Sequence, residues 1–344
     1  MALITSLKST ERTTFVLPDL LANWPFNPEP NPCQDIVAQS AAWVESFKPF
    51  DAKAQNAFNR CKFGIFASLA YPHATGAHFR VACDLMNLFF VFDEYSDCAD
   101  GEAVGKQAAD IMNALRYPDT IPPEGDSLLG AMTRDFWLRT MKCASESSAQ
   151  RFIRNFDEYT DAVRQEAVDR DVGRIRSVPE YLKLRRGTIG VHPSFDYYLL
   201  RDDLPDECVN HPDVQRLASA AVDMTILAND VYSYNKEQSK GEDSHNLVAV
   251  VMKEHDLTVQ EAMNYIGDLY NHIRKQYCED FQDLPRFNDN VDGLVREFCY
   301  GTGIWVTTNI KWSFASERYF GKEGMEIMKH RTVTLLPKVD KLFK

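Results

Sequence analysis

The sequence predicts an all-α protein, a single-domain bundle of roughly ten to twelve helices. Apolar residues recur with helical spacing from Gln34 onward, whereas the apolar–polar alternation of half-buried strands is scarce. The 344 residues are 44% hydrophobic and 12% aromatic, which is enough apolar material for one large core. Neither a linker nor an internal repeat divides the chain. One helical domain therefore accounts for most of it.

Proline sets the first boundary. Four prolines between residues 25 and 32 cannot continue a helix, so we expect an extended N-terminal arm over residues 1–32 whose aromatic side chains pack on the body. A helical domain then covers residues 33–320, and residues 321–344 form a C-terminal tail that we expect to be mobile or to fold over the site. Helices are expected at 35–47, 53–70, 77–97, 102–116, 126–143, 148–170, from 178, and at 214–238, 246–254, 258–280, 290–299 and 302–318.

Composition excludes several classes. The net charge of −12 disfavours nucleic-acid binding, which depends on a basic surface. The eight cysteines lack the spacing of a zinc site or a disulfide framework. The first residues lack the apolar region of a signal peptide, and no stretch approaches the ~20 apolar residues of a membrane span. We therefore expect a cytoplasmic protein.

An apolar run that ends in carboxylates is the first functional signal. Residues Leu85–Phe92 are followed by Asp93, Glu94 and Asp97. Asp93 and Asp97 are four apart, so on a helix they share one face. Burying two carboxylates is costly unless a cation joins them, and carboxylates without His or Cys suit a hard divalent ion such as Mg²⁺. A solvated acidic helix end is the alternative interpretation.

A second apolar run, Ala220–Ala228, ends in Asn229, Ser233 and Glu237. Their spacing of four residues places an amide oxygen, a hydroxyl and a carboxylate in one row on a helix, with Lys236 beside it. Two such helices facing one another would hold Mg²⁺ ions around a polyanion above apolar walls.

Together these two motifs resemble those of class I terpene synthases, and the wider sequence resembles the sesquiterpene synthases of basidiomycete fungi. The similarity extends from residues 15–20 to residues 316–321. It implies a helical bundle with a central active-site cavity, a carbon–oxygen lyase that acts on farnesyl diphosphate, three Mg²⁺ ions, and a monomer or homodimer. Glu94 stands where many family members have Asp, which leaves open whether it binds metal.

The resemblance also assigns roles. Two adjacent arginines, Arg185 and Arg186, precede the helix-breaking Gly190, and counting back from Gly190 favours Arg186 over Arg185 as the residue that senses diphosphate. Gly190 can expose its carbonyl to substrate. The expected metal ligands are Asp93, Asp97, Asn229, Ser233 and Glu237. The expected diphosphate contacts are Arg186, Lys236, Arg318 and Tyr319. The aromatic rings expected to line the cavity are Phe89, Phe90, Trp305 and Trp312.

The product class follows from the resemblance alone. The sequence around both motifs is similar to the branch that closes the farnesyl cation between carbons 1 and 11, giving a humulyl cation and protoilludene-type hydrocarbons. Closure between carbons 1 and 10 is the competing route. A chain-elongating prenyl transferase and a non-catalytic helical interaction module are further alternatives.

The polar residues 239–245 form a candidate lid, in which we expect His245 to have a structural role.

Overall fold

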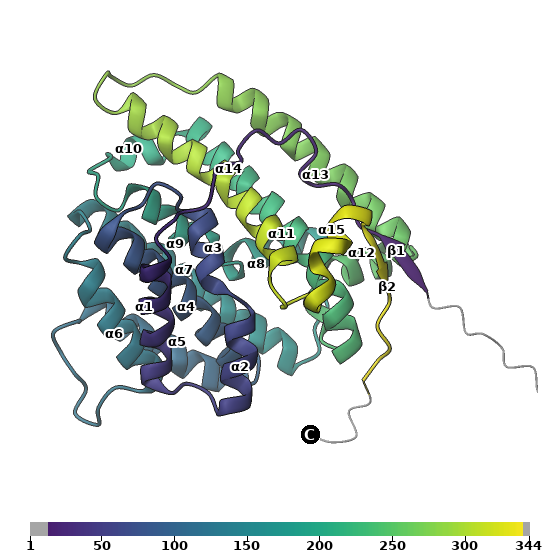
Figure 1. The fold of residues 1–344 in the computed structure, drawn as a ribbon, viewed down its shortest axis with the longest axis horizontal. Coiled ribbons are helices and arrows are strands. Elements are labelled where there is room, and N and C mark those ends of the chain that lie inside the picture. Colours follow the sequence, from purple (N-terminus) through teal and green to yellow (C-terminus); the bar gives the residue numbers. More distant parts are fainter. Residues whose placement is uncertain (1–12, 340–344) are drawn as a thin grey trace, which may run out of the picture.

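The computed structural model describes residues 13–339 and is a bundle of α-helices (Figure 1). The helices are α1 (Gln34–Phe47), α2 (Ala52–Arg60), α3 (Phe63–Ala70), α4 (Gly76–Ser96), α5 (Gly101–Arg116), α6 (Leu128–Thr140), α7 (Glu146–Asp171), α8 (Val178–Thr188), α9 (Val191–Phe195), α10 (Asp206–Val209), α11 (Pro212–Lys240), α12 (Leu247–His255), α13 (Val259–Gln282), α14 (Asp292–Ala315) and α15 (Gly324–His330). Shorter elements are the 3₁₀ helices η1 (Asp196–Leu199), η2 (Asp243–His245) and η3 (Gly321–Glu323), and the strands β1 (Thr14–Val16) and β2 (Thr332–Thr334). The all-α prediction is confirmed.

Two helices, α4 and α11, lie in the interior and position the rest. None of the residues 79–92 of α4 or 221–238 of α11 is exposed, as expected for helices that are apolar around most of their circumference. Helices α1, α3 and α6 pack against α4, while α8, α12, α13 and α14 pack against α11. The polar ends of both apolar runs are therefore held inside the bundle.

Two predicted helix boundaries are wrong. The expected helix over 53–70 is divided into α2 and α3, because Lys62 adopts a left-handed conformation with φ of 54° between them. The expected helices at 290–299 and 302–318 are instead the single helix α14. Glycines within α14 mark close approaches rather than a break. A Cβ on Gly301 would lie 2.6 Å from the ring of Tyr198, and one on Gly303 would lie 2.6 Å from the ring of Phe26.

The two chain ends pair with each other. Strands β1 and β2 are antiparallel, with Phe15 opposite Val333, and they lie side by side at one edge of the bundle (Figure 1). The arm is buried at Trp24 and Phe26, as expected from its aromatic residues. The described part of the tail, residues 321–339, packs on the body, because it contains α15 and β2 and is hydrogen-bonded to α11, and it does not line the cavity. Residues 1–12 and 340–344 lie outside the described range.

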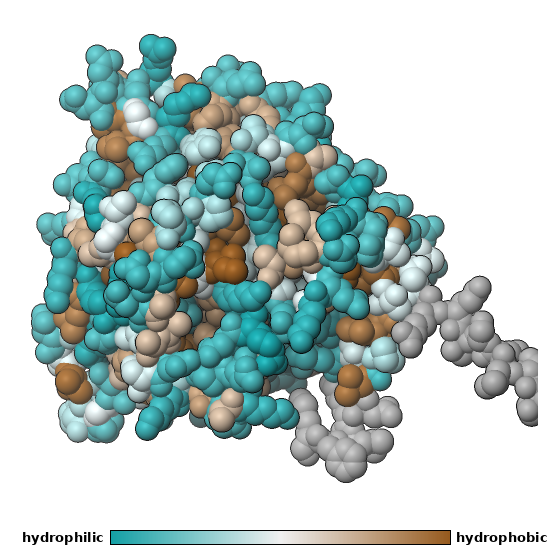
Figure 2. All heavy atoms as spheres, viewed as in Figure 1, coloured by the Kyte–Doolittle hydropathy of each residue, from teal (hydrophilic) through white to brown (hydrophobic). Residues whose placement is uncertain are grey.

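Most large apolar side chains are buried in the interior. Figure 2 shows one face on which hydrophilic side chains predominate and hydrophobic ones form scattered groups. Large aromatic side chains fill the interior instead, among them Trp137, Phe152 and Tyr197. Across residues 13–339, no helix is long and apolar enough to cross a membrane.

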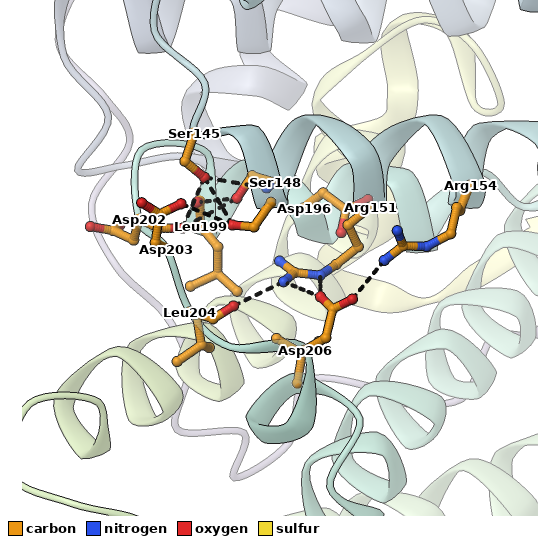
Figure 3. Close-up of polar contacts among 12 residues, drawn as sticks. Ser145, Ser148, Arg151, Arg154, Asp196, Leu199, Asp202, Asp203, Leu204 and Asp206 are labelled. Carbon is orange, nitrogen blue, oxygen red and sulfur yellow. Dashed lines mark hydrogen bonds and ion pairs between the residues drawn. The ribbon is translucent and has the colours of Figure 1, made fainter. Parts of the chain in front are cut away.

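The connection that leads into α11 is tied to α7 by side-chain hydrogen bonds (Figure 3). Ser148 Oγ donates to the carbonyl of Leu199 at 2.7 Å. Arg151 Nη2 donates to Asp206 Oδ1 at 2.7 Å, and Arg154 Nη2 donates to the other carboxylate oxygen of Asp206 at 2.9 Å. These contacts fix the chain between η1 and α10, and thereby the point where α11 begins.

Asp196 is a buried carboxylate beside this network and is 2% exposed. Its Oδ2 accepts a hydrogen bond from Asn155 Nδ2 at 2.8 Å, yet burial outweighs this contact and raises the pKa of Asp196 to about 7. A carboxyl group whose pKa is higher in the folded than in the unfolded state contributes most to the stability of the fold when it is protonated and least when it is ionised. Its contribution to stability is therefore lost as the pH rises from about 4 through about 7.

We predict that Asp196→Asn, a neutral substitute of similar shape, is more stable than wild type by a margin that grows with pH. The margin in free energy of unfolding should widen between pH 5 and pH 7 and level off above, as measured by urea denaturation at each pH. Asp203→Asn, at an exposed position on the same connection, is the control. A margin for Asp196→Asn that stays constant with pH would contradict the assignment.

Candidate active site

A cavity of about 490 Å³ lies at the polar ends of α4 and α11 and is bounded by α7, α8, α14 and η2. Its volume is within the range of small-molecule sites. Apolar walls are formed by Phe66, Met86, Phe89, Phe90, Trp305 and Trp312. Polar groups are contributed by Asp93, Asp97, Arg185, Asn229, Glu237, Arg318 and Tyr319. The cavity thus joins both predicted motifs over an aromatic surface.

The last turn of α4 carries the first polar wall. Arg318, which follows α14, donates to Asp93 Oδ2 at 2.6 Å and to Glu94 Oε1 at 3.1 Å. The pKa of Asp93 is nevertheless raised, because burial and the neighbouring carboxylates Glu94 and Glu166 outweigh Arg318. Burial, with Asp93 next in effect, raises the pKa of Asp97 to about 8. This wall therefore carries more acid than Arg318 and the neighbouring Arg170 and Arg185 neutralise.

The second polar wall is on α11. Asn246 Nδ2 lies 3.1 Å from Ser233 Oγ and donates to Glu237 Oε2 at 2.9 Å, so one amide holds two members of the motif together. Burial, followed by the charge of Asp230, raises the pKa of Glu237 to about 7. Asn229 and Glu237 line the cavity, while Ser233 is buried beside them.

The two arginines of α8 point in different directions. Arg186 makes a two-pronged ion pair with Asp223, at 2.6 and 2.9 Å, and lies outside the cavity lining. Arg185 lines the cavity and donates to Asn229 Oδ1 at 2.9 Å. The prediction that Arg186 rather than Arg185 faces the site is therefore wrong. Helical spacing could have shown this, because Arg185 shares a face with Tyr181 and Thr188, which are both buried.

Lys236 and Tyr319 connect the second wall to the segment after α14. Lys236 Nζ donates to the carbonyl of Arg318 at 2.6 Å and is not among the residues that line the cavity. Asn229 Nδ2 donates to Tyr319 Oη at 3.0 Å. Lys236 thus supports Arg318, and Tyr319 lies against the first residue of the second motif.

Two further residues at the site have no place in the sequence-based prediction: Glu166 lines the cavity, and Asn246 supports the motif on α11. Glu166 of α7 lies 3.1 Å from His245 Nε2, which ties the predicted lid residues to α7. Burial would raise the pKa of Glu166, but His245 and Arg185 together lower it to about 2. Glu166 stands in a charge-rich helix without a local motif, so sequence gave no signal for it. Asn246 was detectable as a helix-capping residue, since it caps α12.

The aromatic part of the cavity is itself rigidly packed. Phe90 stacks on Phe63 with ring centroids 3.8 Å apart, and the guanidinium of Arg318 lies 5.1 Å from the Phe90 ring centre. Phe89 packs on Phe156 with ring centroids 5.4 Å apart. The Phe89 ring also lies close to Gly190, where an added Cβ would be 3.3 Å from Phe89 Cε1, so a larger residue would require the ring to shift slightly. The predicted rings Phe89, Phe90, Trp305 and Trp312, and Gly190, all line the cavity.

The donor set fits a hard divalent cation. Carboxylate and amide oxygens line the space between the walls, with the Ser233 hydroxyl buried beside them, and the raised pKa values of the acids indicate a local lack of positive charge. In residues 13–339, no three His, Cys, Asp or Glu side chains are grouped closely enough to hold an ion by themselves. Each wall instead offers one or two carboxylates, which is the usual protein share of a Mg²⁺ shell.

A helical bundle with oxygen ligands on two walls above an aromatic cavity is the architecture of class I terpene synthases. The family model "Terpene synthase family 2, C-terminal metal binding" matches residues 84–276. The chain belongs to the terpene synthase family.

Curated relatives agree with this assignment, and a solved structure shares the fold. A Δ6-protoilludene synthase of Stereum hirsutum is 48% identical over 93% of this chain and 88% of its own length. A Δ6-protoilludene synthase of Armillaria gallica is 44% identical over 94% of both chains. The crystal structure of an α-eudesmol synthase has the same fold, with a TM-score of 0.76 over 85% of this chain and 97% of that one, at 20% identity.

We predict that Arg185→Gln weakens Mg²⁺-dependent binding of inorganic diphosphate by about tenfold or more, because a charge-assisted contact in the cavity is lost. Arg186→Gln is the matched control and should change binding less than about twofold. Titration calorimetry with Mg²⁺ and inorganic diphosphate measures both. A larger loss for Arg186→Gln than for Arg185→Gln would contradict the placement.

Proposed function

We propose that this protein is a Mg²⁺-dependent sesquiterpene cyclase that ionises farnesyl diphosphate and cyclises the resulting carbocation. The observation that carries the proposal is that Asp93, Asn229 and Glu237 line one aromatic cavity, with Ser233 buried beside them. The names of the relatives support the substrate class. A prenyl transferase normally has a second aspartate-rich motif, and the row on α11 argues against that alternative.

The residues that would hold Mg²⁺ are Asp93, with Asp97 as a further candidate, on one wall and Asn229, Ser233 and Glu237 on the other. The chemistry supplied by bound Mg²⁺ is neutralisation of the charge that develops on diphosphate as its C–O bond breaks. The raised pKa values of the acids are consistent with such a role, since a cation would return them to the ionised form.

Arg185, Arg318 and Tyr319 supply hydrogen-bond donors to the leaving group. Arg185 and Arg318 approach from different walls, and both are held by carboxylates or amides that fix their orientation. Donors that are fixed before the reaction stabilise developing charge without a cost of reorganisation. Lys236 acts on this set through the carbonyl of Arg318.

The aromatic walls of the cavity would stabilise and enclose the carbocation. Phe89, Phe90, Trp305 and Trp312 present ring faces, each worth roughly 0.5–2 kcal/mol to a desolvated cation. Their packing against other rings holds the flexible prenyl chain in a reactive conformation and excludes water that would quench the cation.

For the product we propose a protoilludene-type hydrocarbon formed through 1,11 closure, because the relatives named above are Δ6-protoilludene synthases. Closure between carbons 1 and 10 is the competing outcome. Pathways whose barriers differ by ~1.4 kcal/mol already differ tenfold in product ratio. Cavity shape decides between them at a level finer than residue type.

Incubation of the purified protein with farnesyl diphosphate and Mg²⁺, followed by gas chromatography and mass spectrometry, tests the proposal. We expect a tricyclic hydrocarbon and inorganic diphosphate, with no turnover in EDTA. Longer prenyl chains after addition of isopentenyl diphosphate would indicate a prenyl transferase, and no diphosphate release under any condition would indicate a non-catalytic module. A germacrene-type main product would overturn the 1,11 assignment alone.

We predict that Asn229→Leu and Glu237→Gln lower turnover by roughly 100-fold or more, because several kcal/mol of charge stabilisation is lost. The melting temperature of Glu237→Gln should stay the same or rise, since the substitution removes a half-buried acid whose raised pKa shows that it lacks sufficient counter-charge. Asp213→Asn, at the opposite end of α11, is the control. Wild-type turnover in either site variant would remove these residues from the metal site.

A further inference from the structure

The outer side of the last turns of α11 carries polar residues that the proposed chemistry does not use. Asn235, Gln238 and Ser239 are 6%, 4% and 7% exposed, and none of them lines the cavity. They lie in the same two turns as Ser233 and Glu237. Buried polar side chains at these positions must have hydrogen-bond partners elsewhere.

The partners are backbone groups of the C-terminal tail. Asn235 Nδ2 donates to the carbonyl of Thr334 at 3.0 Å, and Asn235 Oδ1 accepts from the N–H of Leu336 at 2.9 Å. Gln238 Nε2 donates to the carbonyl of Leu336 at 2.8 Å. The side chain of Asn235 therefore pairs with the tail in both directions, as a neighbouring strand would.

Ser239 extends this contact toward the cavity mouth. Its Oγ donates to the carbonyl of Pro337 at 2.7 Å, and its own carbonyl accepts from the N–H of Val339 at 2.7 Å. Gly241 and Glu242, which follow two and three residues later, line the cavity. The tail thus holds α11 up to the start of the polar loop.

The tail is in turn anchored on the body. Strand β2 pairs with β1, whose Val16 exchanges two hydrogen bonds with the side chain of Gln260 on α13, at 2.8 and 3.2 Å. Arg331 forms an ion pair with Asp19 of the arm. Phe15 of β1 is buried and packs edge-on against the ring of Tyr234, at 6.3 Å. Both chain ends therefore form one layer against α11.

We infer that residues 332–339, here called the strap, position the second metal motif by holding the outer side of α11, with Asn235 and Gln238 as the positioning residues. The inference rests on the proposed function of that motif. Ligands must be held within roughly 0.5 Å for productive geometry, and supporting contacts of metal ligands are worth about 10- to 100-fold in affinity. The strap provides such support from the side of the helix opposite the ligands.

Two changes remove the strap's contacts while leaving the cavity intact. Asn235→Leu deletes both bonds to the tail at similar volume, and a chain that ends at Thr334 keeps β2 but lacks the partners of Gln238 and Ser239. Thr334→Val is the matched control, because its bond to Asn235 is made by the backbone carbonyl and its side chain is exposed. A chain that ends at Val339 is the control for truncation.

Hydrogen exchange of the ligand-free protein and calorimetric titration with Mg²⁺ and inorganic diphosphate are the readouts. We expect faster exchange of amides 233–240 with unchanged exchange of 85–97, and binding that is weaker by about tenfold. Both controls should match wild type. Unchanged exchange at 233–240, or equal acceleration in α4, would overturn the inference, since the strap would then be dispensable or merely part of global stability.

The two proposals fail in different ways. If wild type binds no Mg²⁺ and diphosphate, the proposed function fails, whereas exchange at 233–240 still tests whether the strap holds α11. If wild type binds but Asn235→Leu binds equally well, the strap inference fails and the function stands. Should the shortened chain not fold, Asn235→Leu and Gln238→Leu carry the test.

Discussion

The structure depends on an excess of negative charge that lines one cavity between two helix ends. Asp93 and Asp97 on α4 face Glu237 on α11, and the arginines between them do not restore the ordinary pKa values of these acids. Removing carboxylates from water is costly without compensating cations. The fold retains this charge at its centre, which is the behaviour of a site that uses cations brought from solution. Divalent metal ions bound there would balance the charge of the carboxylates and of a polyanionic substrate.

The remainder of the bundle keeps the two walls apart and rigid. Asn246 fixes Ser233 and Glu237 from one side of α11, and the paired chain ends contact the other side through Asn235. Arg170 closes the end of α4 by donating to the carbonyls of Ser96 and Ala99. Below the polar walls, stacked rings leave an apolar space. Charge at the mouth and rings at the floor separate ionisation from carbon–carbon bond formation within one cavity.

Sequence predicted the helices and both motifs because these signals are local. The four-residue spacing of Asn229, Ser233 and Glu237 is visible without a structure. What sequence could not supply depends on contacts between distant segments. The pairing of the tail with the arm and the position of Glu166 have no local pattern. Distance from Gly190 favours Arg186, whereas the helical face that carries Tyr181 and Thr188 identifies Arg185 as the residue at the cavity. The predicted break between residues 299 and 302 is absent, and Gly301 and Gly303 there leave room for the rings of Tyr198 and Phe26.

In this mechanism the two walls act together on one metal-bound polyanion. A crystal structure of the protein with Mg²⁺ and inorganic diphosphate tests it most directly. We expect ions bound by Asp93 on one side and by Asn229, Ser233 and Glu237 on the other, with diphosphate between them and Arg185 and Arg318 in contact with its oxygens. Diphosphate bound elsewhere, or ions absent from either wall at saturating Mg²⁺, would show that the two walls do not act together.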